Sequence, residues 1–352
     1  RAYEGGKPAK IENYFPFSKS GAEEGEMVFV TGQPGSTQRQ LTVSQLTTLR
    51  DLTLVNSVIR LAEMRGVLEQ YSKGSPEAAR NAGQALFGVE NGYKALRGRL
   101  SALQDPVLMK QKQDDETALR EFVSRQPALQ AKIGGAWDAI AAAQQAYRQI
   151  EAPYGMIEGG RGFSSKYAGY ARALVRGAEE RAKPNGERLP EYADAKLPEL
   201  EQELFSSAPV YPEYEKVMLA FSLTKLREIL GTDDPFVKQV LGKQSPDQLS
   251  AALIDNTRLG DPAVRKALWQ GGKEAILKSS DPFIKLELAL DPAARAIRTR
   301  YEKEVESVQQ KNSELIAQAR FAQQGTSAYP DATFTLRLSY GEVKGWQEGD
   351  KK

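Results

Sequence analysis

The sequence contains no histidine and no cysteine among its 352 residues. A Ser-His-Asp triad needs an imidazole as its general base, and a cysteine nucleophile needs a thiol, so both are excluded within this chain. Zinc sites built from Cys and His are excluded too, and so are disulfide bonds. What remains is carboxylate or Ser-Lys chemistry, or a chain that breaks no bond by itself. We expect the latter, with no catalytic residue, no metal site and no cofactor.

An excess of charge of one sign and long apolar runs are also lacking. There are 48 Lys and Arg residues against 46 Asp and Glu residues, which gives a formal net charge of +2. Without a long basic run, nucleic acid is not an expected partner. No uninterrupted apolar stretch approaches the roughly 18 residues of a membrane helix. We therefore expect a globular chain with no membrane span, in two domains or one elongated domain.

Helical periodicity dominates the sequence between residues 40 and 325. Two stripes of apolar residues recur at spacings of three and four, one from Leu46 to Ile59 and one from Leu86 to Leu103. A capping side chain precedes a proline at four predicted helix starts: Ser75-Pro76, Ser245-Pro246, Asp261-Pro262 and Asp281-Pro282. The last of these helices is predicted to run to about Gly325.

Two stretches interrupt the helical pattern. Residues 183–212 contain five prolines, which predicts a loop-rich crossover with one short helix. The glycines from Gly159 to Gly162 predict a bend between helices.

Strand patterns occur only near the two ends. The run from Met27 to Thr31 predicts a buried strand, and the alternation from Phe334 to Tyr340 predicts a half-buried one. Such strands are too few to bury a core alone. We interpret residues 40–325 as a helical domain inserted into a β domain, of which 1–39 and 326–352 are fringes. A complete α+β protein whose terminal strands pair with each other is the open alternative.

Candidate chemistry in the helical region is sparse. Ser222 and Lys225 have the Ser-x-x-Lys spacing of a serine nucleophile and its base, but the Ser-Asp-Asn and Lys-Thr-Gly elements of such enzymes are absent. Gly32 to Thr37 lacks the lysine of a phosphate loop. The acids at 114–116 and 233–234 are interpreted as a solvated first turn and a helix cap. These patterns favour structural roles.

The predicted helix over 84–103 carries Asn91 on the side opposite its apolar stripe. Small residues surround it in sequence, namely Gly88, Gly92, Ala95 and Gly98. Each glycine costs up to about 1 kcal/mol of helix stability relative to alanine. Either close contact with another helix, with Asn91 bonded to a buried carbonyl, or access for a ligand would offset this cost. The residues alone favour the helix contact.

Several segments, taken in order, resemble a known protein family. They are Arg1-Ala-Tyr3 with Gly6-Lys-Pro8, Gly25 to Gly32 followed by Pro34-Gly-Ser-Thr37, Glu90-Asn91 with Lys94-Ala95, Asp281-Pro-Phe-Ile284, and Tyr329 to Gly341. The sequence resembles the bacterial dipeptidyl-peptidase family of chymotrypsin-like serine peptidases, serine peptidase family forty-six. The resemblance covers the whole chain, and the segment 329–341 is its most specific part.

This resemblance implies a double β-barrel peptidase with a large helical insertion over its active-site cleft. Such enzymes remove dipeptides from free peptide N-termini, are periplasmic or secreted, and form homodimers. The family's triad histidine and aspartate would precede Arg1, and its serine would follow Lys352. The expected fold is therefore mainly α, a multi-helix lid domain with short strands left from the barrel. Its expected partners are the rest of that barrel and a peptide substrate, and the chain alone is expected to be inactive.

One site residue follows from the resemblance. Asn91, in Glu90-Asn91-Gly92, matches the asparagine that helps to hold the substrate's α-amino group in this family. An α-amino group has a pKa near 8 and is largely cationic at neutral pH, and an asparagine carbonyl can accept its hydrogen bond. Gln33 departs from the aromatic residue or histidine that family members often carry in that turn. A noncatalytic helical scaffold or binding protein, complete as it stands, is the alternative function.

Overall fold

The computed structural model describes residues 3–4, 7–35, 37–327 and 331–349. Several residues that contribute to the family resemblance lie outside the described residues, namely Arg1, Ala2, Gly6, Ser36, Tyr329 and Pro330. The chain divides into two compact units, the first formed by Arg1–Gln40 with Tyr329–Lys352 and the second by Leu41–Ala328. The second unit is helical, and the expectation of a mainly-α fold is confirmed.

The first unit contains short antiparallel strand pairs. Strand β1 (Tyr3–Glu4) pairs with β2 (Lys7–Pro8), and β3 (Met27–Gly32) pairs with β4 (Arg337–Glu342). In the longer pair, Met27 lies opposite Glu342 and Gly32 lies opposite Arg337. The two predicted terminal strands therefore exist and pair with each other.

The predicted burial of these strands is wrong. Phe29 is 60% exposed and Tyr340 is 73% exposed, although their rings contact each other at 6.3 Å between centroids. Phe334, predicted to lie in the second strand, precedes β4 and is 70% exposed. The physical reason is that strand alternation buries a face only when another layer covers it, and among the described residues of the first unit β3 and β4 form a sheet of two strands only.

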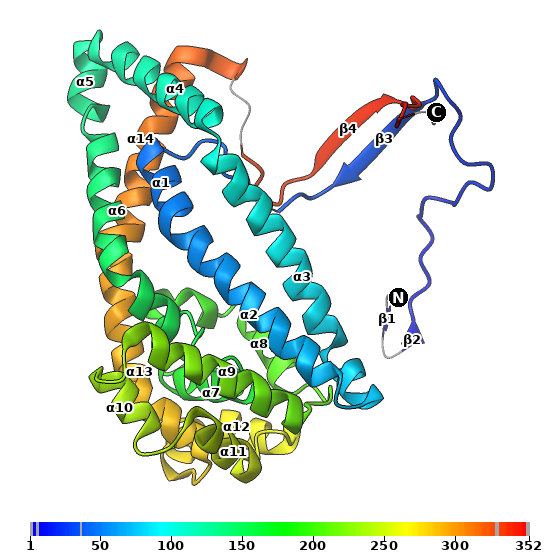
Figure 1. Cartoon of the computed structure of the whole chain (residues 1–352), viewed down its shortest axis with the longest axis vertical. Coiled ribbons are helices and arrows are strands. Elements are labelled where there is room, and N and C mark those ends of the chain that lie inside the picture. The colour runs from blue at the N-terminus through cyan, green and yellow to red at the C-terminus, as the bar shows by residue number, and fades with distance from the viewer. Residues whose placement is uncertain (1–2, 5–6, 36, 328–330, 350–352) are drawn as a thin grey trace. The chain divides into compact units, whose positions relative to one another are not determined.

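The second unit begins with a helical hairpin. Helix α1 (Val43–Thr48) continues through a π-helical segment (Leu49–Thr53) into α2 (Leu54–Ser72), and α3 (Pro76–Gln104) returns antiparallel along it (Figure 1). The next helices are α4 (Pro106–Ser124), α5 (Pro127–Ile133), α6 (Ala136–Pro153), α7 (Lys166–Glu180), α8 (Leu197–Leu204), α9 (Pro212–Leu230), α10 (Pro235–Leu241), α11 (Pro246–Asn256), α12 (Pro262–Lys278), α13 (Pro282–Tyr301) and α14 (Ser307–Gln324).

Local sequence signals account for the helix boundaries. At the four predicted starts, the Ser or Asp side chain accepts a backbone hydrogen bond from the first turn and a proline follows it. Helix α13 continues through a π-helical segment (Glu302–Glu306) into α14, which ends at Gly325 with a φ of +60°. The Asp234 side chain caps α10 as predicted. The acids at 114–116 lie inside α4, so their assignment to a first turn is wrong.

The predicted interruptions are also present. Residues 183–212 contain α8 and two short 3₁₀ turns, Asn185–Glu187 and Pro190–Tyr192. Helix α6 passes into a π-helical segment (Tyr154–Glu158), and the glycines that follow it turn the chain toward α7. We call residues 154–162 the elbow. In the elbow, a methyl group on Gly155 would lie 2.8 Å from the Arg161 guanidinium carbon, so this glycine makes room for that side chain.

The largest apolar core lies among the elbow and helices α7 to α13. It contains the fully buried Leu219, Leu223 and Ile284. Arg265 is fully buried beside it, and its guanidinium donates to the carbonyls of Leu204, Ser206, Leu259 and Gly260 at 2.5 to 3.0 Å. These four acceptors satisfy the buried cation, which holds α12 against the loop after α8.

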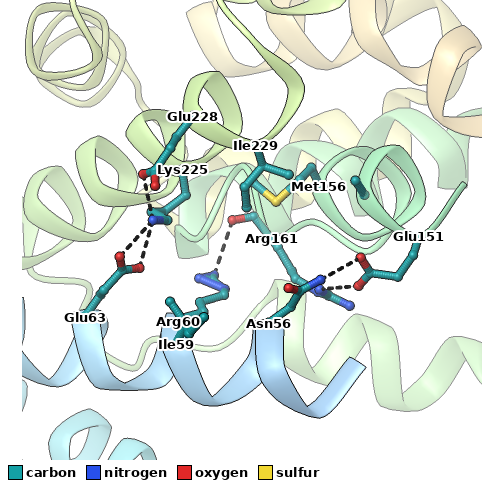
Figure 2. A pocket seen from close by; sticks show the side chains of 11 residues that line it. Asn56, Ile59, Arg60, Glu63, Glu151, Met156, Arg161, Lys225, Glu228 and Ile229 are labelled. Atoms are coloured by element: carbon teal, nitrogen blue, oxygen red, sulfur yellow. Dashed lines mark hydrogen bonds and ion pairs between the residues drawn. The ribbon is translucent and has the colours of Figure 1, made fainter. Parts of the chain in front are cut away.

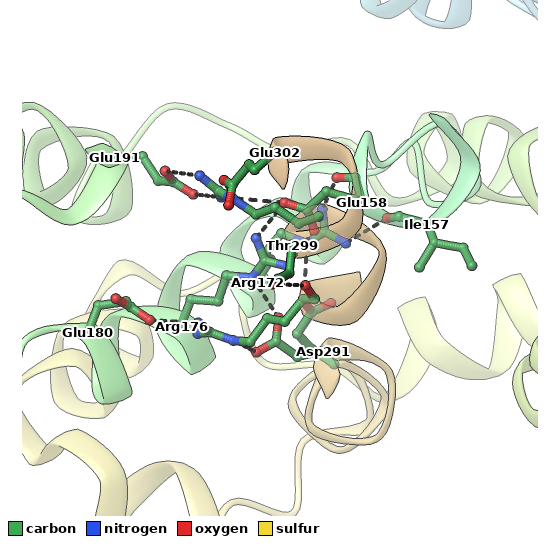
Figure 3. A network of polar contacts seen from close by, with 12 residues as sticks. Ile157, Glu158, Arg172, Arg176, Glu180, Glu191, Asp291, Thr299 and Glu302 are labelled. Carbon is green, nitrogen blue, oxygen red and sulfur yellow. Dashed lines mark hydrogen bonds and ion pairs between the residues drawn. The ribbon is translucent and has the colours of Figure 1, made fainter. Parts of the chain in front are cut away.

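A network of ion pairs joins the elbow, α7 and α13 (Figure 3). Arg176 is buried between Glu158 and Asp291, at 2.6 Å from a carboxylate oxygen of each. Arg295 connects Asp291 to Glu180, again at 2.6 Å. Because each buried charge has partners from other elements, the network fixes the elbow relative to the two helices.

Candidate functional site

Helix α3 presents Asn91 on an exposed face. The opposite face packs on α2 and α9 through residues such as Ala82 and Val89, which are buried with Leu68 and Met218. Positions 84, 88, 91, 95 and 98 follow helical spacing along the exposed side, and each is exposed. The helix therefore exposes a stripe made mostly of small residues, with Asn91 at its centre.

The residues alone favoured a helix contact that buries Asn91, and this prediction is wrong. The Asn91 amide is exposed and forms no hydrogen bond with any residue that the structure describes. Nothing lies within 4 Å of a methyl group placed on Gly88 or Gly98, and only Gly92 packs closely, at 3.4 Å from Leu61. Close packing therefore explains one of the small residues, whereas the others leave backbone open to an approaching molecule.

The neighbourhood of Asn91 has a defined chemistry. Its carbonyl oxygen and amide nitrogen can accept and donate hydrogen bonds. Phe87 lies one helical turn before it and is 68% exposed, so an apolar ring lies next to the polar group. Such a surface can contact a polar chain end and an apolar side chain together. Sequence reasoning selected Asn91 but missed Phe87, although its place four residues before Asn91 puts both on one face.

Ser222 and Lys225 do not form a nucleophile and base. The Ser222 hydroxyl is fully buried, donates to the Leu219 carbonyl at 2.9 Å and accepts from the Ser164 amide at 3.0 Å. The Lys225 ammonium binds Glu63 at 2.8 Å and Glu228 at 2.6 Å. Burial lowers the pKa of Lys225, but the two carboxylates outweigh it and raise the pKa above its ordinary value. The prediction of structural roles for this pair is confirmed.

A cavity of about 170 Å³ lies between α2, the end of α6, the elbow and α9 (Figure 2). Its polar lining comes from distant parts of the sequence, and its members are Asn56, Arg60, Glu63, Glu151, Arg161, Lys225 and Glu228. The Arg161 guanidinium binds Glu151 at 3.0 Å, and Asn56 donates to the same carboxylate at 3.2 Å. Sequence reasoning missed this cavity because no local pattern brings these residues together.

Two further properties bear on function. Within the described ranges, no group of three or more acidic side chains is arranged to hold a metal ion. Among the described helices, none is long and apolar enough to cross a membrane.

The fold defines a mainly helical protein class with a small strand pair contributed by the two ends of the chain. The chain belongs to the Peptidase S46 family, whose sequence model matches residues 1–352. The family resemblance seen in the sequence is confirmed.

Two kinds of relative illustrate the match. The Asp/Glu-specific dipeptidyl-peptidase of Shewanella putrefaciens is 25% identical over 378 residues, which cover 99% of this chain and 50% of that protein. The crystal structure of Porphyromonas endodontalis DPP11 with the dipeptide Arg-Glu has a TM-score of 0.68 at 17% identity, and covers 99% of this chain and 50% of that one. The same protein with the dipeptide Arg-Asp has a TM-score of 0.59 at 18% identity, with coverages of 99% and 51%. The chain thus spans about half the length of these relatives.

Proposed function

We propose that this chain is the helical, substrate-gating part of a serine-type dipeptidyl aminopeptidase. The observation that carries the proposal is the match to the peptidase family over the whole chain. A dipeptidyl-peptidase among the relatives supports the reaction type. Because the chain has no histidine and its one Ser-x-x-Lys pair is structural, the catalytic triad belongs to sequence outside these residues.

The helical unit restricts access to the peptidase site and binds the free amino terminus of the substrate. Asn91 is the proposed contact, because its amide is exposed and has no partner among the described residues. The open backbone at Gly88 allows a peptide end to approach the helix. Holding the amino terminus at a fixed distance from the nucleophile sets cleavage after the second residue, and covering the site excludes water.

The strands of the first unit are proposed to be fringes of the peptidase's second barrel. The support is the exposed apolar ribbon, in which Phe29, Leu338 and Tyr340 are 60%, 59% and 73% exposed. A patch of this kind is expected to be covered by another surface. The same proposal gives the full-length enzyme a periplasmic or secreted location and a homodimeric state.

A comparison of the isolated chain with the full-length protein tests this function. We expect the full-length protein to release dipeptides from substrates with a free amino terminus. The 352-residue chain, with a helical circular dichroism spectrum as evidence of folding, is expected to release none. A fluorophosphonate, which labels activated serines, should modify the full-length protein only outside residues 1–352. Cleavage by the chain alone, or labelling within it, would contradict the placement of the catalytic serine outside these residues. A full-length protein without peptidase activity would favour the noncatalytic scaffold instead.

A further inference from the structure

The cavity between α2, the end of α6, the elbow and α9 takes no part in the proposed peptidase function, and its charged side chains differ in how they are paired. Two of its three cations already have carboxylate partners. Lys225 is bound by Glu63 and Glu228, and Arg161 is bound by Glu151. These two cations therefore need no further anion.

Arg60 is the exception among the cations of this cavity. Its Nη2 atom donates to the Arg161 carbonyl at 3.2 Å and to the Ser164 hydroxyl at 2.9 Å, and neither acceptor is charged. Its Nη1 atom is buried and has no hydrogen-bond partner. Leaving a buried donor unsatisfied costs about 1 to 3 kcal/mol. Burial, followed by the nearby Arg161 cation, lowers the pKa of Arg60, and the Glu63 carboxylate only partly opposes these two effects, so a further anion beside Arg60 would relieve them.

The rest of the cavity wall is apolar. Ile59 from α2, Met156 from the elbow and Ile229 from α9 line it (Figure 2). Ile59 is 52% exposed and Ile229 is 45% exposed, so these two side chains border the opening to solvent. A volume of about 170 Å³ is close to the roughly 150 Å³ of an engineered cavity that binds benzene. The space therefore accommodates a molecule of several heavy atoms with an apolar part.

We propose that this cavity binds a small carboxylate with a short branched apolar tail. A carboxylate oxygen accepts a hydrogen bond from Nη1 of Arg60, the nitrogen that has no partner, and a hydrogen bond between two charged groups is stronger than one between neutral groups. The tail packs against Ile59 and Ile229. The ligand is either a free carboxylic acid or the C-terminal residue of a short peptide, since both present the same chemistry. Binding there joins α2, and with it the helical hairpin that carries Asn91, to the elbow and α9.

Calorimetric titration of the full chain with isobutyrate tests the proposal, and the dipeptide Gly-Val serves as the peptide source. Wild type is expected to show saturable binding of isobutyrate or of Gly-Val, and the tighter ligand identifies the source. The neutral analogue isobutyramide is expected not to bind, because it lacks the carboxylate. The proposal is overturned if neither isobutyrate nor Gly-Val shows saturable binding at matched ionic strength. It is also overturned if isobutyramide binds as tightly as isobutyrate.

Two variants locate the site. Arg60→Gln removes the cation and is expected to weaken binding at least about tenfold. The control Arg65→Gln lies on the same helix, where Arg65 pairs with Glu69 at 3.1 Å outside the cavity, and should leave binding unchanged. Ile229→Trp fills the opening while keeping Arg60, and should abolish binding even if Arg60→Gln fails to fold. Equal affinities of wild type, Arg60→Gln and Ile229→Trp would exclude this cavity as the site.

Discussion

At the scale of single residues, Glu180 shows how the buried ion network depends on pH. Its carboxylate is fully buried and accepts from Lys183 at 2.8 Å, from Arg295 at 2.6 Å and from the Leu189 amide at 2.9 Å. Burial alone would raise the pKa of Glu180. The three donors outweigh burial and lower the pKa from its ordinary value of 4.5 to about 2.

The lowered pKa predicts an acid-dependent loss of stability. Between pH 4.5 and about 2 the unfolded chain binds a proton at Glu180 and the folded chain does not. The stabilisation is therefore complete above pH 4.5 and disappears as the pH falls toward 2. Glu180→Gln should lower the free energy of unfolding at pH 7 by roughly 2 to 3 kcal/mol and flatten its pH dependence in this window, as measured by urea denaturation.

A neighbouring variant controls for the change in net charge. Glu179→Gln removes a half-exposed carboxylate that lies 3.5 Å from Arg295, and should change stability by less than about 0.5 kcal/mol. Burial raises the pKa of Glu215 and of Glu287. Their contribution to the pH dependence of stability therefore has the opposite sign to that of Glu180, and it is the same in both variants. The difference between the two variants therefore isolates Glu180, and identical pH profiles would contradict the assigned role of its donors.

At the scale of secondary-structure elements, α7 and α12 meet at a glycine. A methyl group on Gly177 would lie 2.2 Å from a ring carbon of Trp269, which is 97% buried in the core. The tryptophan also donates to Glu201 at 2.8 Å, which fixes its ring. Glycine lowers the helix propensity of α7 at position 177, but a larger residue would clash with the Trp269 ring.

Two glycine substitutions in the same helix should have opposite effects. Gly177→Ala is expected to lower the free energy of unfolding by about 1 to 3 kcal/mol, because the ring and the helix must move apart. Gly169→Ala is expected to leave stability unchanged or raise it by up to about 1 kcal/mol, since nothing lies within 4 Å of the added methyl group. Thermal denaturation of both variants measures this contrast. A neutral Gly177→Ala would mean that α7 and α12 are packed less closely than the structure shows.

The elements also show which structural features the sequence could predict. Helix starts such as Ser75-Pro76 and Asp281-Pro282 were predictable because a cap and its proline act within one turn. The burial of β3 was not predictable, because it depends on whether another layer covers the ribbon. The cavity was not predictable either, since Arg60 and Arg161 are 101 positions apart and meet only through tertiary packing.

At the scale of the whole molecule, family membership and the exposed face of α3 give complementary support to the proposed function. The family match supports a peptidase, but it does not say which residue of this chain would meet a substrate. Asn91 was selected through the family resemblance, and its exposure on α3 makes that contact sterically possible. The role of Asn91 thus rests on a specific chemical claim, recognition of a free α-amino group.

The most direct test of that claim is the kcat/KM of the full-length enzyme on one dipeptidyl substrate with a free amino terminus and on its N-acetylated form. A hydrogen bond to a charged group contributes about 1.5 to 3 kcal/mol. Asn91→Ala should therefore lower kcat/KM roughly 10- to 100-fold for the free amine, and hardly at all for the acetylated substrate. The control Gln84→Ala, on the same exposed stripe two turns away, should change neither. Equal free-amine kinetics of wild type and Asn91→Ala would contradict substrate capture at this residue.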